Sequence, residues 1–175
     1  MKFAFLLLFA MVGTSLSAQA TEFRQAQLTD GGSALSITQS DGSTLNAPKV
    51  DGQDGFASPQ VSKNHRYVGW LALDGGHGAS YSQPLDLVVI DEAKRLHRFS
   101  GSFGMVFGWC FAEKGDSVVY RFAFPNGLTP TSFEMRRIKD GKLLRELRLL
   151  ENESQAGGAE VPAWSKCAQT SAVAQ

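Results

Sequence analysis

The stretch Phe107-Gly-Trp-Cys-Phe-Ala-Glu-Lys-Gly-Asp-Ser-Val-Val-Tyr-Arg-Phe-Ala-Phe124 predicts two strands joined by a polar turn. Aromatic and β-branched residues, which favour strands, fill both ends of the stretch. A similar pattern occurs fifty residues earlier, where Val61–Trp70 aligns with Phe111–Tyr120 and places apolar residues on apolar residues at both ends. The stretch is therefore one copy of a repeated unit of strand, turn and strand.

The repeat extends in both directions along the chain. At a shift of forty-eight residues, the strand that begins at Leu85 aligns with the strand that begins at Phe133, and the turns that follow them coincide. At a shift of ninety-nine, the early turn Asp41-Gly42 aligns with Asp140-Gly141. These registers predict two units of four strands, each roughly 48–50 residues long, preceded by a hairpin. They also favour a strand over a helix for Leu143–Leu149, although this segment consists of good helix formers.

Four short strands with a period in this range are typical of β-propeller blades. The segment Ser58–Trp70 resembles the WD40-like repeat of TolB-type propellers, in which a Ser-Pro-Asp-Gly-like turn precedes an apolar strand. Here Ser62-Lys63-Asn64-His65 and Ala112-Glu113-Lys114-Gly115 occupy the place of that turn, and both lack the proline. The resemblance covers roughly residues 56–149 and implies a propeller-like scaffold in a small exported bacterial protein. Members of that family serve as protein-binding scaffolds and as domains beside hydrolases.

The fold class expected is all-β, with two four-stranded antiparallel blade-like sheets and an N-terminal hairpin. A closed propeller typically needs at least four blades, so two units cannot close a ring by themselves. Either the two sheets pack face to face as a sandwich, or chains self-associate through open strand edges to complete a ring. The sandwich is favoured, because each sheet can then bury a face against the other.

Residues 1–20 have the features of a signal peptide: a positive charge at Lys2, an apolar run over Phe3–Val12, and the small-x-small site Ala18-Gln19-Ala20. The apolar run is much shorter than the roughly 20 residues that span a bilayer, so no stable membrane anchor is expected. The predicted location is periplasmic or secreted. Residues 21–150 are expected to form one β-repeat domain, followed by a loosely ordered C-terminal tail over residues 151–175.

Composition and cysteine content limit the possible partners and cofactors. The chain has 17 Lys and Arg against 17 Asp and Glu and no basic patch, which argues against nucleic acid as a partner. Cys110 and Cys167 would enter an oxidising compartment, where a disulfide is possible, but Cys110 would also suit an apolar core as a free thiol. With two cysteines and no suitably spaced histidine, neither a metal site nor a cofactor is expected.

Two loops, Asp74–Pro84 and Pro125–Thr131, follow equivalent strands of the two units and are the predicted contact surface. The candidate binding residues in them are Asp74, His77, Ser80, Tyr81 and Asn126. The favoured function is an exported non-enzymatic binding module, with another exported or envelope protein as its partner. The alternative is a small exported hydrolase that uses His77 and Ser80, although the chain has no Gly-x-Ser-x-Gly elbow.

The other polar candidates are expected to have no functional role. His65 lies in a predicted turn and His97 on a predicted hairpin strand, and both are expected at the surface. Aromatic residues such as Trp109 are expected in the core. Surface charge is the interpretation for the acids Asp86, Asp91, Glu113 and Asp116, and a solvated strand face for Arg136 and Arg137.

Overall fold

The computed structural model of the protein describes residues 22–75, 82–102, 104–112, 114–124, 131–149 and 161–169. The predicted signal peptide and most of both candidate loops lie outside these residues. The strands are β1 (Phe23–Thr29), β2 (Ala34–Gln39), β3 (Thr44–Asn46), β4 (Gly55–Val61), β5 (Tyr67–Asp74), β6 (Gln83–Asp91), β7 (Leu96–Ser100), β8 (Met105–Phe111), β9 (Ser117–Ala123), β10 (Thr131–Arg137) and β11 (Leu143–Leu149). Two short 3-10 helices, η1 (Asp30–Gly32) and η2 (Ala163–Ala168), complete the described elements.

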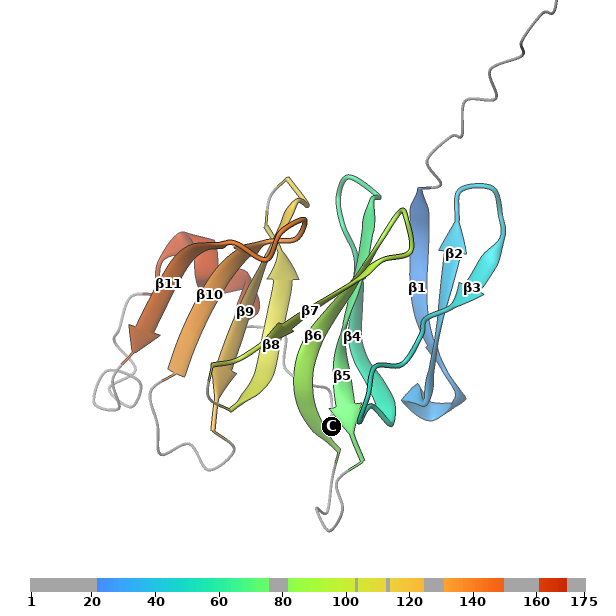
Figure 1. The fold of residues 1–175 in the computed structure, drawn as a ribbon. Coiled ribbons are helices and arrows are strands. Elements are labelled where there is room, and N and C mark those ends of the chain that lie inside the picture. The colour runs from blue at the N-terminus through green and yellow to red at the C-terminus, as the bar shows by residue number, and fades with distance from the viewer. Residues whose placement is uncertain are drawn as a thin grey trace, which may run out of the picture.

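The strands form three antiparallel sheets, none of them closed into a barrel. Sheet 1 contains β1–β3, sheet 2 contains β4–β7 and sheet 3 contains β8–β11, and within each sheet consecutive strands pair with one another. Figure 1 shows the sheets side by side in chain order, with their faces toward each other. The expected all-β class with two four-stranded antiparallel sheets is confirmed, and β1 extends the predicted N-terminal hairpin into a third sheet.

Sheet 2 is buried on both faces because its side chains alternate between two apolar cores. In β5, Val68 and Trp70 belong to the core shared with sheet 1, whereas Tyr67 and Leu71 belong to the core shared with sheet 3. A strand that is buried on both faces has an almost continuous apolar sequence, as Tyr67–Leu73 does. No helix in the described part of the chain has the length and apolar character needed to cross a membrane.

The fifty-residue repeat is visible in the backbone hydrogen bonds of two turns. The Ser62 amide donates to the Tyr67 carbonyl, and the Ala112 amide donates to the Ser117 carbonyl, each at 2.9 Å. In the second half of the unit, β7 and β11 keep the expected shift of forty-eight residues, since Phe99 pairs with Leu87 and Leu147 with Phe133, but β6 and β10 do not. Trp70 pairs with Val88 and Tyr120 pairs with Glu134, which makes the shift between β6 and β10 forty-six residues. The expected shift of forty-eight residues was therefore wrong by two residues for these strands. Because side chains alternate between the two faces of a sheet with a period of two residues, this error leaves the apolar pattern unchanged.

Trp109 fixes the packing of sheet 3 on sheet 2. Its ring is fully buried and lies against Gly69 of β5, where a Cβ atom would be only 2.5 Å from the ring. The indole N–H donates to the Ser58 carbonyl at 3.1 Å, and the Gln60 side-chain Nε2–H donates to the Trp109 carbonyl at 3.2 Å. The expectation that Trp109 is a core residue is therefore confirmed.

The turn between β4 and β5 connects all three sheets. The Phe23 amide in sheet 1 donates to the His65 carbonyl, and the His65 Nδ1–H donates to the Phe23 carbonyl, both at 2.8 Å. Toward sheet 3, the Asn64 amide group donates to the Lys114 carbonyl at 3.2 Å and to the Asp116 carboxylate at 3.0 Å. His65 is exposed, as expected, and the turn holds the sheets in place at this end of the stack.

The outer face of sheet 3 is covered in part by the C-terminal segment. Val161, Trp164 and Ala168 pack against an apolar cluster on this face, and Cys167 of η2 forms a disulfide with Cys110 of β8. The Cα atoms of the two cysteines are 5.9 Å apart. Of the two fates considered for these cysteines, the structure contains the bridge.

A buried polar network lies in sheet 3 on the side that faces sheet 2. The Tyr120 hydroxyl donates to the Glu134 carboxylate, and the Arg136 Nε–H donates to the same carboxylate at 2.6 Å. Burial, followed by the hydrogen bond to Glu134, raises the pKa of Tyr120. The expectation of a solvated face for Arg136 was wrong, because its guanidinium pairs with Glu134 on the same strand and donates to the Tyr120 hydroxyl on β9.

Candidate functional site

The structure describes one of the five predicted binding residues. Asp74 ends β5 and is partly buried, whereas His77, Ser80, Tyr81 and Asn126 lie outside the described residues. The ends of β5 and β9 and the starts of β6 and β10 all lie at the lower end of the stack in Figure 1. The loop surface stays a prediction.

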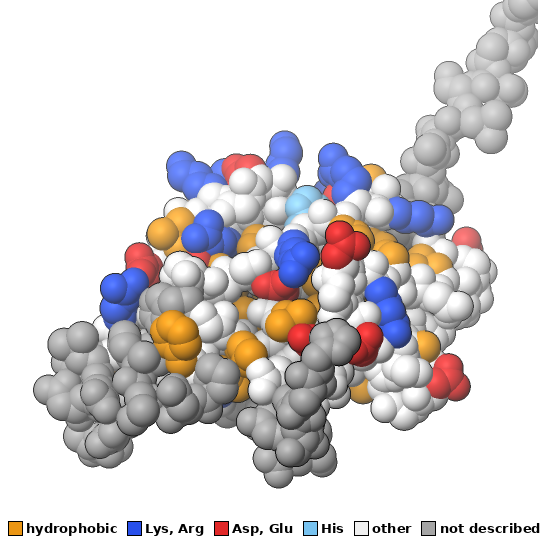
Figure 2. Space-filling view, turned by 60° about the horizontal axis from the view of Figure 1, so that its bottom comes forward, with side chains coloured by type: hydrophobic (Ala, Val, Ile, Leu, Met, Phe, Trp, Pro, Cys, Tyr) orange, Lys and Arg blue, Asp and Glu red, His pale blue; other side chains and the backbone are white. Residues whose placement is uncertain are grey.

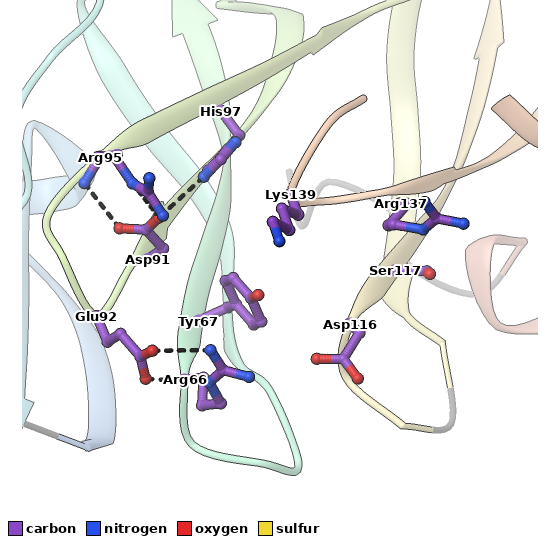
Figure 3. A pocket seen from close by; sticks show the side chains of 10 residues that line it. All are labelled: Arg66, Tyr67, Asp91, Glu92, Arg95, His97, Asp116, Ser117, Arg137 and Lys139. Atoms are coloured by element: carbon purple, nitrogen blue, oxygen red, sulfur yellow. Dashed lines mark hydrogen bonds and ion pairs between the residues drawn. The ribbon is translucent and has the colours of Figure 1, made fainter. Parts of the chain in front are cut away.

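A cavity of about 590 Å³ lies at the opposite end of the stack, between sheets 2 and 3. We call it the turn-end pocket, because its residues come from the turns of both sheets or from strand residues beside those turns (Figure 3). Its volume is within the range of about 300–1,000 Å³ typical of small-molecule sites. The lining residues are Arg66, Tyr67, Asp91, Glu92, Arg95, His97, Asp116, Ser117, Arg137 and Lys139.

Asp91 organises the sheet 2 side of the pocket. Its carboxylate accepts hydrogen bonds from the Ala93 amide at 2.9 Å, the Arg95 amide at 2.9 Å, the Arg95 guanidinium at 2.8 Å and His97 Nε2 at 3.2 Å. Burial acts to raise the pKa of Asp91, but these hydrogen bonds outweigh it and the pKa is lowered. The carboxylate is therefore charged and has its hydrogen-bonding capacity filled from within the protein.

The expectation of surface charge was wrong for two of the acids. Asp91 and Asp86 are both buried, and Asp86 pairs with Arg98 of the adjacent strand β7. Asp116 is exposed, as expected, and Glu113 lies outside the described residues. His97 is half-buried against Asp91 and does not lie freely at the surface. The sequence signal for Asp91 was its position directly before a turn. An Asp at such a position often accepts a hydrogen bond from the backbone amide two residues later.

Arg66 and Glu92 form a second ion pair at the pocket, in the two-bond geometry that suits a guanidinium and a carboxylate. Two guanidinium nitrogens donate to the two carboxylate oxygens, at 3.0 and 2.8 Å. The bond lowers the pKa of Glu92 and raises that of Arg66. The guanidinium also lies 5.8 Å from the centre of the Tyr67 ring, which is within the range of a cation–π interaction. Its partners are therefore groups of the protein itself.

Arg137 is paired as well, since its guanidinium donates to Asp140 at 2.9 Å. Each of the three arginines that line the pocket therefore has a carboxylate partner. Lys139 has no ion pair among the described residues, and the only side-chain hydrogen bond to Asp116 comes from Asn64, on one of its two oxygens. The Tyr67 hydroxyl likewise has no hydrogen-bond partner there, and burial raises its pKa, so it stays a neutral phenol.

The pocket contains a histidine, an aspartate and a serine, but not in the arrangement of a catalytic triad. A triad requires the serine within hydrogen-bond reach of the histidine. Figure 3 shows Ser117 on the opposite side of the pocket from His97, with Lys139 between them. What this arrangement can do is bind: it offers hydrogen-bond donors and charges to a ligand without an activated nucleophile.

Charges of both signs are distributed over the rest of the visible surface. Figure 2 shows Lys and Arg side chains interspersed with Asp and Glu on the face it presents. The described residues contain no group of three or more His, Cys, Asp or Glu side chains that could hold a metal ion. No protein-family model and no curated protein matched the chain in the comparisons.

Proposed function

We propose that this protein is an exported, non-enzymatic binding module that takes its ligand in the turn-end pocket. The observation that carries the proposal is that side chains from two sheets converge on one cavity of about 590 Å³. Sites of this kind, in which a few polar groups meet in a concave space, are the usual places for small ligands. The paired strands on either side anchor the turns that carry these groups, and a backbone that is ordered before a ligand arrives reduces the entropic cost of binding.

The ion pairs around the pocket hold its walls in place and leave two polar groups available to a ligand. Asp91 and Glu92 are each satisfied by hydrogen bonds from the protein, so the walls are stable without a ligand. Lys139 and the Tyr67 hydroxyl remain available, and both project into the space that Figure 3 shows between the two sheets. A cavity is preorganised for a ligand when the carboxylates in its walls already have hydrogen-bond partners and a few other polar groups do not.

The proposal is tested by an NMR titration of the isotopically labelled mature protein with a broad panel of small sugars, amino acids, dipeptides, carboxylates and phosphates. We expect at least one class of compound to shift the backbone amide signals of Tyr67, Ser117 and Lys139. The signals of the opposite strand ends, such as Asp74 and Ala123, should stay unchanged. If no compound shifts the pocket signals, or if shifts occur only at the opposite end, the pocket is not the binding site.

A further inference from the structure

The pairing of charges within the pocket leaves one cation and one anion uncommitted. Arg66, Arg95 and Arg137 are neutralised by Glu92, Asp91 and Asp140. Among the charged residues that line the cavity, Lys139 then forms no ion pair and Asp116 forms none either, although the Asp116 charge acts on Arg66 from a longer distance, and His97 is bound to Asp91. These two opposite charges face the same cavity without forming an ion pair with each other.

The two charges are placed so that a ligand could lie between them. Asp116 comes from the turn between β8 and β9, and Lys139 from the turn between β10 and β11. Figure 3 shows the Lys139 ammonium and the Asp116 carboxylate on either side of the Tyr67 hydroxyl, which points toward the space between them. A ligand that reaches across this space would meet a positive group, a neutral hydroxyl and a negative group in turn.

We infer that the turn-end pocket takes a small zwitterion, namely an amino acid or a short peptide with a free amino group and a free carboxyl group. The carboxylate of the ligand pairs with the Lys139 ammonium, and its ammonium pairs with the open oxygen of Asp116. The Tyr67 hydroxyl donates to or accepts from the polar atoms between the two ends. This inference rests on the proposed function, because it names the ligand class of the same pocket.

The ion pairs in the walls favour a ligand with a single carboxylate over a doubly charged anion such as a phosphate monoester. Three carboxylates, those of Asp91, Glu92 and Asp116, line the cavity beside four cations, and of these cations only Lys139 is without an ion pair. Like charges placed close together are unfavourable, and the cost increases with the charge of the ligand. A zwitterion has no net charge and satisfies both uncommitted groups at once.

The test uses dipeptides in three forms. A panel of free dipeptides with apolar, polar and charged side chains is titrated by NMR, and the tightest binder is then compared with its N-acetyl and C-terminal amide derivatives. We expect each blocked derivative to bind about tenfold more weakly, as the loss of one charge-assisted hydrogen bond predicts. Equal binding of the free and blocked forms overturns the inference, as does the absence of pocket shifts at about 10 mM free dipeptide.

Two variants assign the ends of the ligand to their partners. Lys139→Met should abolish the preference for the free acid over the amide while keeping the preference for the free amine. Asp116→Asn, which preserves the acceptor for Asn64, should have the opposite effect. The matched controls are Lys142→Met in the same turn and Asp51→Asn, both exposed and outside the pocket lining, and neither should change binding. Unchanged preferences in both pocket variants overturn the assignment.

The outcomes also separate this inference from the proposed function. If dipeptides fail but another compound of the broad panel shifts the pocket signals, the ligand class is wrong and the pocket is still a binding site. If no compound of either panel shifts those signals, the proposed function fails as well.

Discussion

At the scale of single residues, the contact of Gly69 with Trp109 determines how closely sheets 2 and 3 approach. The indole ring occupies the space that a Cβ of residue 69 would need, and two hydrogen bonds hold its strand in place. Because the ring is fully buried, it has no free direction in which to move. The glycine is therefore required by packing, although its position in a strand costs conformational entropy.

Gly69→Ala should destabilise the protein by about 1–3 kcal/mol, the usual cost of overpacking a dense core. The measurement is urea unfolding followed by tryptophan fluorescence. Gly55→Ala is the control, since an added Cβ in that strand would make contacts of 3.4 Å or longer, and its free energy of unfolding should change much less. Equal effects of the two substitutions would mean that Trp109 does not pack on Gly69.

The lowered pKa of Glu92 predicts a dependence of stability on pH. A carboxylate with a depressed pKa in the folded protein stabilises it above the ordinary value of 4.5, and this contribution is lost as the pH falls through the lower folded value. Glu92→Gln should therefore make the fall in unfolding free energy below about pH 5 shallower. Urea unfolding at a series of pH values measures this, with Asp51→Asn as the control. Identical slopes for Glu92→Gln and the wild type would contradict the Arg66 pairing.

Single residues also show what the sequence could not predict. Trp109 was placed correctly in the core because an aromatic residue in an apolar strand has few alternatives. Asp86, Asp91 and Arg136 were assigned to the surface, because their partners come from adjacent strands or from backbone amides of a turn. Which residues face each other across two strands depends on the register of the strands. The alternation of apolar and polar residues stays the same when the register shifts by two residues, so this pattern does not identify the partners.

At the scale of elements, η2 covers part of the outer face of sheet 3 and is fixed there by the disulfide. The bridge between Cys110 and Cys167 spans 57 residues. Without it, the segment is attached to the sheet mainly by its contacts with a small apolar cluster. Trp164 packs against this cluster and anchors the segment on the apolar side.

Removal of the disulfide should cost about 4 kcal/mol in the chain-entropy model. The double variant Cys110→Ser, Cys167→Ser is compared with the oxidised wild type by urea unfolding. The control is thiol titration of the unfolded, unreduced wild type, which should show no free thiol. Two free thiols in that titration would show that the isolated protein lacks the bridge.

The strands were the most predictable elements, because their apolar pattern and turns recur along the chain. The segment Leu143–Leu149 is a strand, as the repeat required, despite its helix-forming composition. The alignment of β6 with β10 was wrong by two residues, since the turn over residues 138–142 is one residue longer than the turn over residues 92–95, and a bulge after Met135 adds a second residue. The turn-end pocket was not predicted, because its residues meet only when two sheets are stacked.

At the scale of the whole molecule, the two outermost faces of the stacked sheets differ. Ser36 and Thr38 alternate with the buried Leu35 and Ile37 in β2, so the outer face of sheet 1 is polar. The outer face of sheet 3 is apolar and is covered in part by η2. Because the outer face of sheet 1 is polar and that of sheet 3 is covered in part, we expect the three sheets of one chain to form the complete stack, and we do not expect several chains to complete a ring.

The mature protein should therefore sediment as single chains in analytical ultracentrifugation across a range of concentrations. Self-association was the alternative left open by the sequence, and a ring would appear as a discrete larger species. The double variant Cys110→Ser, Cys167→Ser provides a comparison, because release of η2 exposes the apolar face and should promote association. A stable oligomer of the oxidised wild type would contradict the single-chain stack.

The most direct test is a crystal structure of the protein without residues 1–20, bound to the tightest binder from the NMR panels. We predict three stacked sheets, with the ligand in the turn-end pocket between Tyr67 of sheet 2 and Lys139 of sheet 3. A ligand bound at the opposite end, beside Asp74, would show that the binding surface is the one first predicted from the loops. Sheets 2 and 3 found apart, without Trp109 against Gly69, would contradict the fold from which the pocket is built.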